Sequence, residues 1–85
     1  MTPVYAIIAE AEKARDKYGD FTSTHEALGV LVEEFDELRA AIHSNKLASI
    51  AHEACQVSAV ALRLHDLCER AMGGTADGFK ARNGA

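Results

Sequence analysis

The chain has 85 residues, of which 48% are hydrophobic, and this is enough for one domain with a small core. Its formal net charge is −4, and it contains no run of basic residues. This composition argues against a nucleic-acid backbone or an anionic membrane surface as the main partner. It is compatible with a phosphate ligand held through metal ions, because bound cations reverse the local charge.

No segment is long and apolar enough to span a bilayer, and residues 1–19 contain acids and lack the basic leader of a secretion signal. Cys55 and Cys68 fall on one predicted helix, at a separation of roughly 20 Å. A disulfide cannot bridge that distance. Both are therefore expected to be reduced thiols in a cytoplasmic protein.

The first predicted helix begins at Thr2 and Pro3, a capping hydroxyl followed by proline at the first helical position. Gly19 ends it, and residues 19–23 form a connector. One face of this helix is expected to be buried, because its apolar residues recur every three or four positions: Val4, Ile7, Ile8, Ala11, Ala14 and Tyr18.

Ser23 and Glu26 form a capping-box pattern that begins a second helix. Residues 43–46, HSNK, predict the turn after it, since Ser and Asn favour caps and turns. The apolar stripe of this helix is expected to be Leu28, Leu31, Val32, Phe35, Leu38 and Ile42.

A third helix is predicted from about Leu47 to Met72, before Gly73 and Gly74. Its apolar residues cover more than half of its circumference, which is more than two other helices can bury. The sequence therefore predicts an all-α fold, a helical hairpin plus an N-terminal helix, assembled into an oligomeric helical bundle as a homodimer or homotetramer. Residues 1–74 form the predicted domain, and residues 75–85 are expected to be a flexible C-terminal tail.

Four acids stand within residues 31–38, LVEEFDEL. On a helical wheel, Glu34 and Glu37 lie on one edge of the apolar stripe, where small neighbours leave room beside them. Asp36 falls on the other flank and is interpreted as a solvated charge. Glu33 lies away from the stripe, and its role is open.

The third helix contains a matching pair, Glu53 and Gln56, three residues apart on an apolar face. Folding the two helices antiparallel about residue 45 sets position 37 opposite 53 and position 34 opposite 56. The predicted cluster then holds three carboxylates and an amide oxygen, which cannot all ionise near pH 7 without a cation among them. Mg²⁺ is the expected cation, with Mn²⁺ as an alternative.

A charged surface without a ligand is the alternative, because acid pairs three residues apart are common on exposed helices. Zinc is not expected, since the chain has no paired histidine or cysteine ligands. The two His-Glu pairs do not complete the zinc-protease pattern HExxH, because Gly29 and Gln56 occupy the place of its second histidine.

The segments KYGDFTSTHEALGVLVEEFDELRAAI and HEACQVSAVALRLHDL resemble the MazG-like nucleotide pyrophosphohydrolases, particularly their short phage-type members. The resemblance covers about residues 12–70. The signature of this family is EExxE, a spacer and ExxD. The corresponding residues here are Glu33-Glu34-Phe35-Asp36-Glu37 and Glu53-Ala54-Cys55-Gln56.

Gln56 departs from this signature, because it stands where the family usually has aspartate. Its amide oxygen can still ligate Mg²⁺ but brings no charge. Metal affinity could therefore fall, one ion could be lost, or nucleotides could be bound without cleavage. Some short phage-type relatives also carry glutamine here, so the residue is not interpreted as a sign of inactivation.

The resemblance implies cleavage of a (d)NTP between its α and β phosphates, giving a (d)NMP and pyrophosphate. Mg²⁺ ions held by Glu34, Glu37, Glu53 and Gln56 would grip the triphosphate and polarise the attacking water. Glu33, the first glutamate of the signature, is the candidate general base. The alternative is a non-catalytic helical module that binds nucleotides or a protein partner.

Five further residues are candidate substrate contacts, each with a simpler alternative. Lys17 could reach a phosphate or be only solvated. Phe21 either packs in the core or stacks on a base, and His25 either lies near a docked base or sugar or belongs to the helix cap. Lys80 and Arg82, in the tail, could close over phosphates or contact nothing specific. No local motif indicates which base is preferred.

Overall fold

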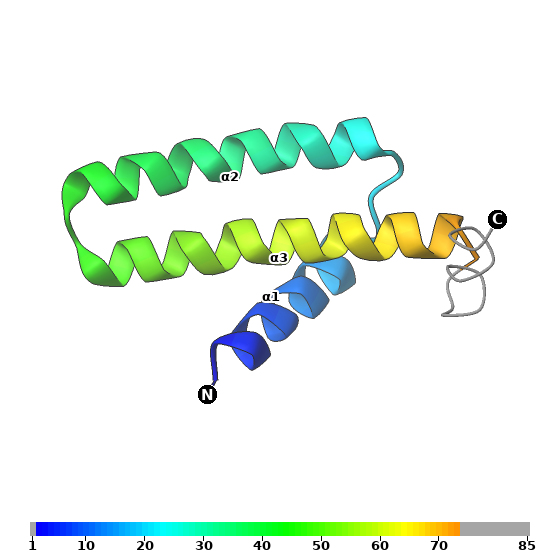
Figure 1. The fold of residues 1–85 in the computed structure, drawn as a ribbon, viewed down its shortest axis with the longest axis horizontal. Helices are drawn as coiled ribbons and strands as arrows, with labels where there is room; N and C mark the ends of the chain where they lie inside the picture. The colour runs from blue at the N-terminus through cyan, green and yellow to red at the C-terminus, as the bar shows by residue number, and fades with distance from the viewer. Residues whose placement is uncertain (1, 74–85) are drawn as a thin grey trace, which may run out of the picture.

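The computed structural model describes residues 2–73, most of which lie in three helices (Figure 1). Helix α1 spans Pro3–Tyr18, α2 spans Thr24–Ser44 and α3 spans Leu47–Ala71. No strand occurs among residues 2–73, which confirms the predicted all-α class and the predicted order of helices. Gly74 and the predicted tail, with Lys80 and Arg82, lie outside the described residues. None of the three helices is long and apolar enough to cross a membrane.

The ends of α1 form where the sequence predicts. The Thr2 hydroxyl accepts a hydrogen bond from the backbone N–H of Tyr5 at 3.4 Å. At the other end Gly19 takes a φ of 78°, a backbone conformation that glycine adopts without steric cost, and its N–H bonds to the carbonyl of Arg15. The chain can therefore leave α1 sharply and turn into the connector.

The predicted cap of α2 is confirmed, but the predicted turn after it begins too early. The Ser23 hydroxyl accepts from the N–H of Glu26, whose carboxylate accepts from the N–H of Thr22. Helix α2 continues through Ser44 instead of ending before residue 43. It ends because Asn45 takes the left-handed conformation with φ 60°, which asparagine tolerates better than most residues.

Helix α3 is the central element of the fold. Helix α2 runs back along it as an antiparallel hairpin, and α1 packs obliquely against it (Figure 1). Phe21 of the connector, Ala27 of α2 and Val60 of α3 form the buried core. Cys55 and Cys68, also on α3, are free thiols, as the sequence predicts.

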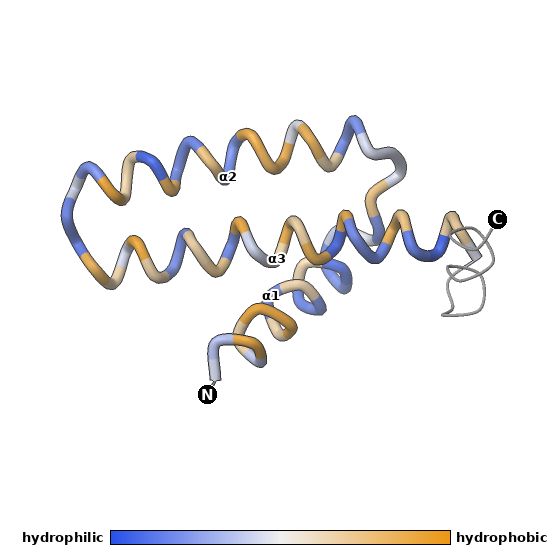
Figure 2. Tube along the Cα trace, viewed as in Figure 1, coloured by the Kyte–Doolittle hydropathy of each residue, from blue (hydrophilic) through white to orange (hydrophobic). Residues whose placement is uncertain are grey.

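The buried face of α2 differs from the predicted stripe. Four of the predicted residues, here called the α2 stripe, are about half exposed: Leu28, Val32, Phe35 and Ile42. Ala27 and Ala41 are buried instead, and Glu34, which lies between them in the sequence, is partly buried. Small alanines let α2 approach α3 closely, so the helix turns its alanine face inward and these four larger residues outward, while Leu31 of the predicted stripe packs against the core. Figure 2 shows the alternation of hydrophobic and hydrophilic residues along α2 and α3.

The predicted buried face of α1 is correct only in part, since Ile7 and Ala14 are partly buried. Val4, Ile8 and Tyr18 are exposed, and only Ala11 is fully buried. The reason is that α1 packs mainly on α3, so much of its apolar surface has no neighbour within residues 2–73. Tyr18 is thereby available at the surface.

Four charged side chains fix the connector onto α3. Asp20 forms ion pairs with Arg15 of α1 at 2.9 Å and with Arg70 of α3 at 2.6 Å, and Asp66 pairs with both arginines. The hydrogen bonds from Arg70 hold the pKa of Asp20 below its usual range. This network holds the segment that carries Phe21 in place.

Candidate metal centre

Three carboxylates converge between α2 and α3. Glu34, Glu37 and Glu53 each place one oxygen within 4.8 Å of the corresponding oxygens of the other two. Glu34 and Glu37 share a face of α2 because they are three residues apart, and Glu53 comes from the facing helix. The antiparallel register that predicts this cluster from the turn near residue 45 is confirmed.

Two of these carboxylates have oxygens that are buried without a hydrogen-bond partner. These atoms are Oε2 of Glu34 and Oε1 of Glu53. An unsatisfied buried acceptor costs about 1–3 kcal/mol, and more when it is charged. Folding alone does not explain such a pair, so a ligand that satisfies both oxygens is expected here.

The electrostatics of the cluster favour the same interpretation. Burial, followed by the negative charges of Glu37 and Glu53, raises the pKa of Glu34 above its ordinary value of 4.5. Among residues 2–73, no lysine, arginine or histidine forms an ion pair with any of the three carboxylates. Their mutual repulsion is therefore not neutralised within this part of the chain.

The donor set fits a hard divalent cation. Carboxylate oxygens are preferred ligands of Mg²⁺ and Mn²⁺, and the cluster contains no nitrogen or sulfur donor. Gln56 is half buried and lines the same groove as Glu34, so its amide oxygen is the next candidate ligand. Asp36 is exposed and bonded to Arg39 at 2.6 Å, as expected for a solvated charge.

The cluster opens into a groove with two parts. The first part, here called the charged cavity, has a volume of about 350 Å³ and contains all three carboxylates of the cluster with Gln56, Lys13, Lys17 and His52. The second part, here called the Phe21 cavity, has a volume of about 460 Å³ and includes Phe21, Val30, Val60, Glu33 and Arg63. The two parts share Glu10, Ala14, Tyr18, Glu34 and Gln56, and so form one continuous groove.

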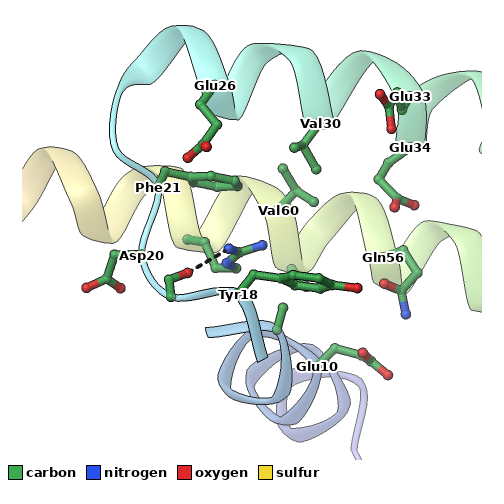
Figure 3. A pocket seen from close by; sticks show the side chains of 14 residues that line it. Glu10, Tyr18, Asp20, Phe21, Glu26, Val30, Glu33, Glu34, Gln56 and Val60 are labelled. Carbon is green, nitrogen blue, oxygen red and sulfur yellow. Dashed lines mark hydrogen bonds between the residues drawn. The ribbon is translucent and has the colours of Figure 1, made fainter. Parts of the chain in front are cut away.

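Figure 3 shows the Phe21 cavity from close by. Phe21 lies at one end, and Glu34 and Gln56 lie together at the other. The Tyr18 ring lies between these two ends of the cavity, with its hydroxyl toward Gln56 in this view. The groove therefore passes from an end at Phe21, where the Glu26 carboxylate also lies, to the end that holds Glu34 and Gln56.

The predicted site residues distribute unequally over this groove. Glu33 lines the Phe21 cavity but is not one of the three clustered acids. Lys17 lines the charged cavity, with its Nζ 5.2 Å from the centre of the Tyr18 ring. His25 is exposed and lines neither cavity, so the structure does not bring it to the groove.

Of the two roles predicted for Phe21, packing in the core and stacking on a base, the structure supports packing. It is only 6% exposed and belongs to the core, although its ring also contributes to the cavity wall. The guanidinium of Arg63 lies 4.1 Å from the centre of this ring. A base cannot occupy the ring face that the guanidinium already covers.

Sequence reasoning missed two residues of the groove. The helical pattern predicts that Tyr18 lies on a buried face, but its side chain is 71% exposed. Arg63 has no predicted role, although it interrupts an apolar run of α3 between Val60 and Leu64. A charge within such a run is the signal that could have identified it, because a buried charge requires a partner.

Comparison of the chain with protein-family models, with curated proteins and with solved structures gives no match. The MazG-like resemblance therefore stays a prediction from the two acidic segments. The convergence of these segments in the fold is a separate, geometric observation.

Proposed function

We propose that this protein is a Mg²⁺-dependent hydrolase that cleaves a (d)NTP between its α and β phosphates, giving a (d)NMP and pyrophosphate. The observation that carries the proposal is the cluster of Glu34, Glu37 and Glu53, with two buried oxygens that lack partners. A triphosphate is strongly negative and would not approach such a cluster by itself. It would bind there together with divalent cations, which both the acids and the phosphates require.

The two parts of the groove support a nucleotide as the substrate. The charged cavity combines the acids with Lys13 and Lys17, a set suited to metal-bound phosphates. The Phe21 cavity adds the apolar side chains of Val30 and Val60, which suit a nucleoside. A nucleotide lying along the groove would place its α-phosphate near Glu34 and Gln56, two of the residues common to both parts.

The position of Glu33 supports cleavage at the α-phosphorus. Glu33 lines the Phe21 cavity and not the charged cavity, so it stands on the nucleoside side of the acids. Bound Mg²⁺ would supply charge neutralisation on the phosphates and a lowered pKa of a bound water. Glu33 would accept the proton of the water that attacks, and Glu34, Glu37, Glu53 and Gln56 would fix the metal.

A panel of dNTPs incubated with Mg²⁺, with pyrophosphate as the detected product, tests the proposal. Glu37→Ala and Glu53→Ala should each abolish turnover, whereas Asp36→Ala should retain it. Asp36 is the matched control because it is an acid on the same helix that is exposed and paired with Arg39. Release of orthophosphate in place of pyrophosphate would contradict cleavage at the α-phosphorus. No release from any nucleotide by folded protein would favour the alternative of a non-catalytic binding module.

We also propose that the protein is a homo-oligomer, a homodimer or homotetramer, that covers the α2 stripe. Leu28, Val32, Phe35 and Ile42 lie on one side of α2, because their spacings of four, three and seven residues are helical repeats. Each is at least half exposed, and Leu47, just beyond the turn, is 82% exposed. A contiguous apolar surface of this kind is typical of a protein–protein contact.

A further inference from the structure

Arg63 is a buried charge without a carboxylate partner. Only 9% of its surface is exposed, and no carboxylate of residues 2–73 comes within ion-pair distance of its nitrogens. Its guanidinium lies over the ring of Phe21 and makes one hydrogen bond, from Nη2 to the carbonyl oxygen of Gly19 at 3.2 Å, drawn as the dashed line in Figure 3. The other three arginines within residues 2–73 form ion pairs with Asp20, Asp36 or Asp66. Arg63 therefore differs from them in having hydrogen-bond donors to spare.

These spare donors border a cavity large enough for a ligand. A guanidinium has five N–H donors and no acceptor, and one of the donors is used by Gly19. Arg63 lines the Phe21 cavity, whose volume of about 460 Å³ lies within the range of small-molecule sites. A ligand that fills this cavity must present acceptors to Arg63.

Glu26 supplies the opposite kind of group on the same cavity. Its Oε1 accepts the N–H of Thr22, and its Oε2 makes no hydrogen bond within the described part of the chain. Figure 3 shows the Glu26 carboxylate beside Phe21, at the end of the cavity away from Glu34. The cavity thus offers donors from Arg63 and an acceptor from Glu26 at the end farthest from the acidic cluster.

We propose that the Phe21 cavity binds the base of the nucleotide and that Arg63 selects guanine. This inference rests on the proposed function, because it takes the acidic cluster as the end that binds the phosphates. Guanine presents two adjacent acceptors, O6 and N7, to an arginine fork, whereas adenine replaces O6 with an amino donor. Guanine also carries N–H donors on its N1 and N2, and Glu26 Oε2 is an acceptor for them. The exposed Tyr18 ring provides a stacking surface between the two ends of the groove.

Binding of GMP and AMP to the full chain in the presence of Mg²⁺, followed by NMR titration, tests this inference apart from catalysis, because neither ligand has a β-phosphate to lose. GMP should bind roughly tenfold more tightly than AMP, in keeping with one good arginine–guanine pair. Arg63→Lys retains the charge but loses the fork, so GMP affinity should fall to that of AMP while AMP affinity stays unchanged. Equal affinities of the wild type for GMP and AMP, or no binding of either at millimolar concentration, would overturn the inference.

A second variant keeps the test decisive if Arg63→Lys does not fold. Glu26→Gln retains the capping hydrogen bond to Thr22 and removes the carboxylate charge, and its side chain is exposed. It should weaken GMP binding and leave AMP binding unchanged. Equal loss of both ligands in a folded variant would contradict selection. GMP selectivity without pyrophosphate release would sink the proposed function alone, whereas pyrophosphate release at equal rates from dGTP and dATP would sink the inference alone.

Discussion

Glu34 of α2 and Glu53 of α3 bring carboxylate oxygens into one cluster, and each also holds a buried oxygen that accepts no hydrogen bond. Both residues stand on the facing surfaces of the hairpin, where apolar side chains would stabilise the fold more. Acids at these positions cost stability unless a ligand neutralises them. The stability of the protein should therefore report directly on the cluster.

Glu34→Gln should stabilise the metal-free protein, and the gain should increase with pH. The pKa of Glu34 is raised in the fold, so the folded state holds a proton that the unfolded state has already released. Its contribution to stability is therefore lost as pH rises from about 4.5 through the raised pKa. Midpoints of thermal unfolding for wild type and variant, in the presence of a chelator, should agree near pH 4 and diverge toward pH 7. A constant difference across this range would contradict the raised pKa. Asp36→Asn is the control, and its effect should not follow this pattern.

Mg²⁺ should raise the unfolding midpoint of the wild-type protein near pH 7. A cation that binds only the folded state raises the free energy of unfolding, and above Kd the gain grows with the logarithm of the cation concentration. At one hundred times Kd the gain is about 2.7 kcal/mol. Glu53→Gln should remove most of this shift, because it takes one charge from the cluster, and Asp36→Asn should retain it. Mn²⁺ should act in the same direction. An equal Mg²⁺ shift in both variants would place the ion elsewhere.

Gln56→Asp should lower the Mg²⁺ concentration needed for half-maximal stabilisation and for turnover. The substitution adds a negative charge beside Glu34 and keeps an oxygen donor in the same part of the groove. Without Mg²⁺ the same change should lower the unfolding midpoint, since it adds repulsion. The two opposite effects are measured by thermal unfolding with and without the ion. An unchanged Mg²⁺ titration would show that this side chain lies outside the coordination shell.

The sequence is sufficient to predict the acidic cluster because that prediction depends only on the position of one turn. Once α2 and α3 fold back near Asn45, the register places Glu34 and Glu37 near Glu53, and an error of one residue would not separate them. The helix caps were also predictable, since Thr2 and Ser23 act through local hydrogen bonds.

The packed faces of the helices were not predictable in the same way. The most apolar stripe of α2 was expected to be buried, but Ala27 and Ala41 allow closer approach to α3 and face inward instead. Hydrophobic pattern alone does not distinguish a face that packs within the chain from one that packs on another molecule. Arg63 was missed because its partners, Gly19 and Phe21, lie more than forty residues away in the sequence.

The α2 stripe yields a prediction about assembly. The wild-type protein should have at least twice the monomer mass of 9.1 kDa, as measured by light scattering after gel filtration. Leu28→Ser with Phe35→Ser should give a monomer with unchanged helix content, because these half-exposed side chains contribute little to the core of the single chain. Tyr5→Ser is the matched control, since it removes a large and somewhat more exposed side chain from α1 instead of α2. A double variant that keeps the wild-type mass, or a Tyr5→Ser variant that alone dissociates, would place the contact between subunits on another face.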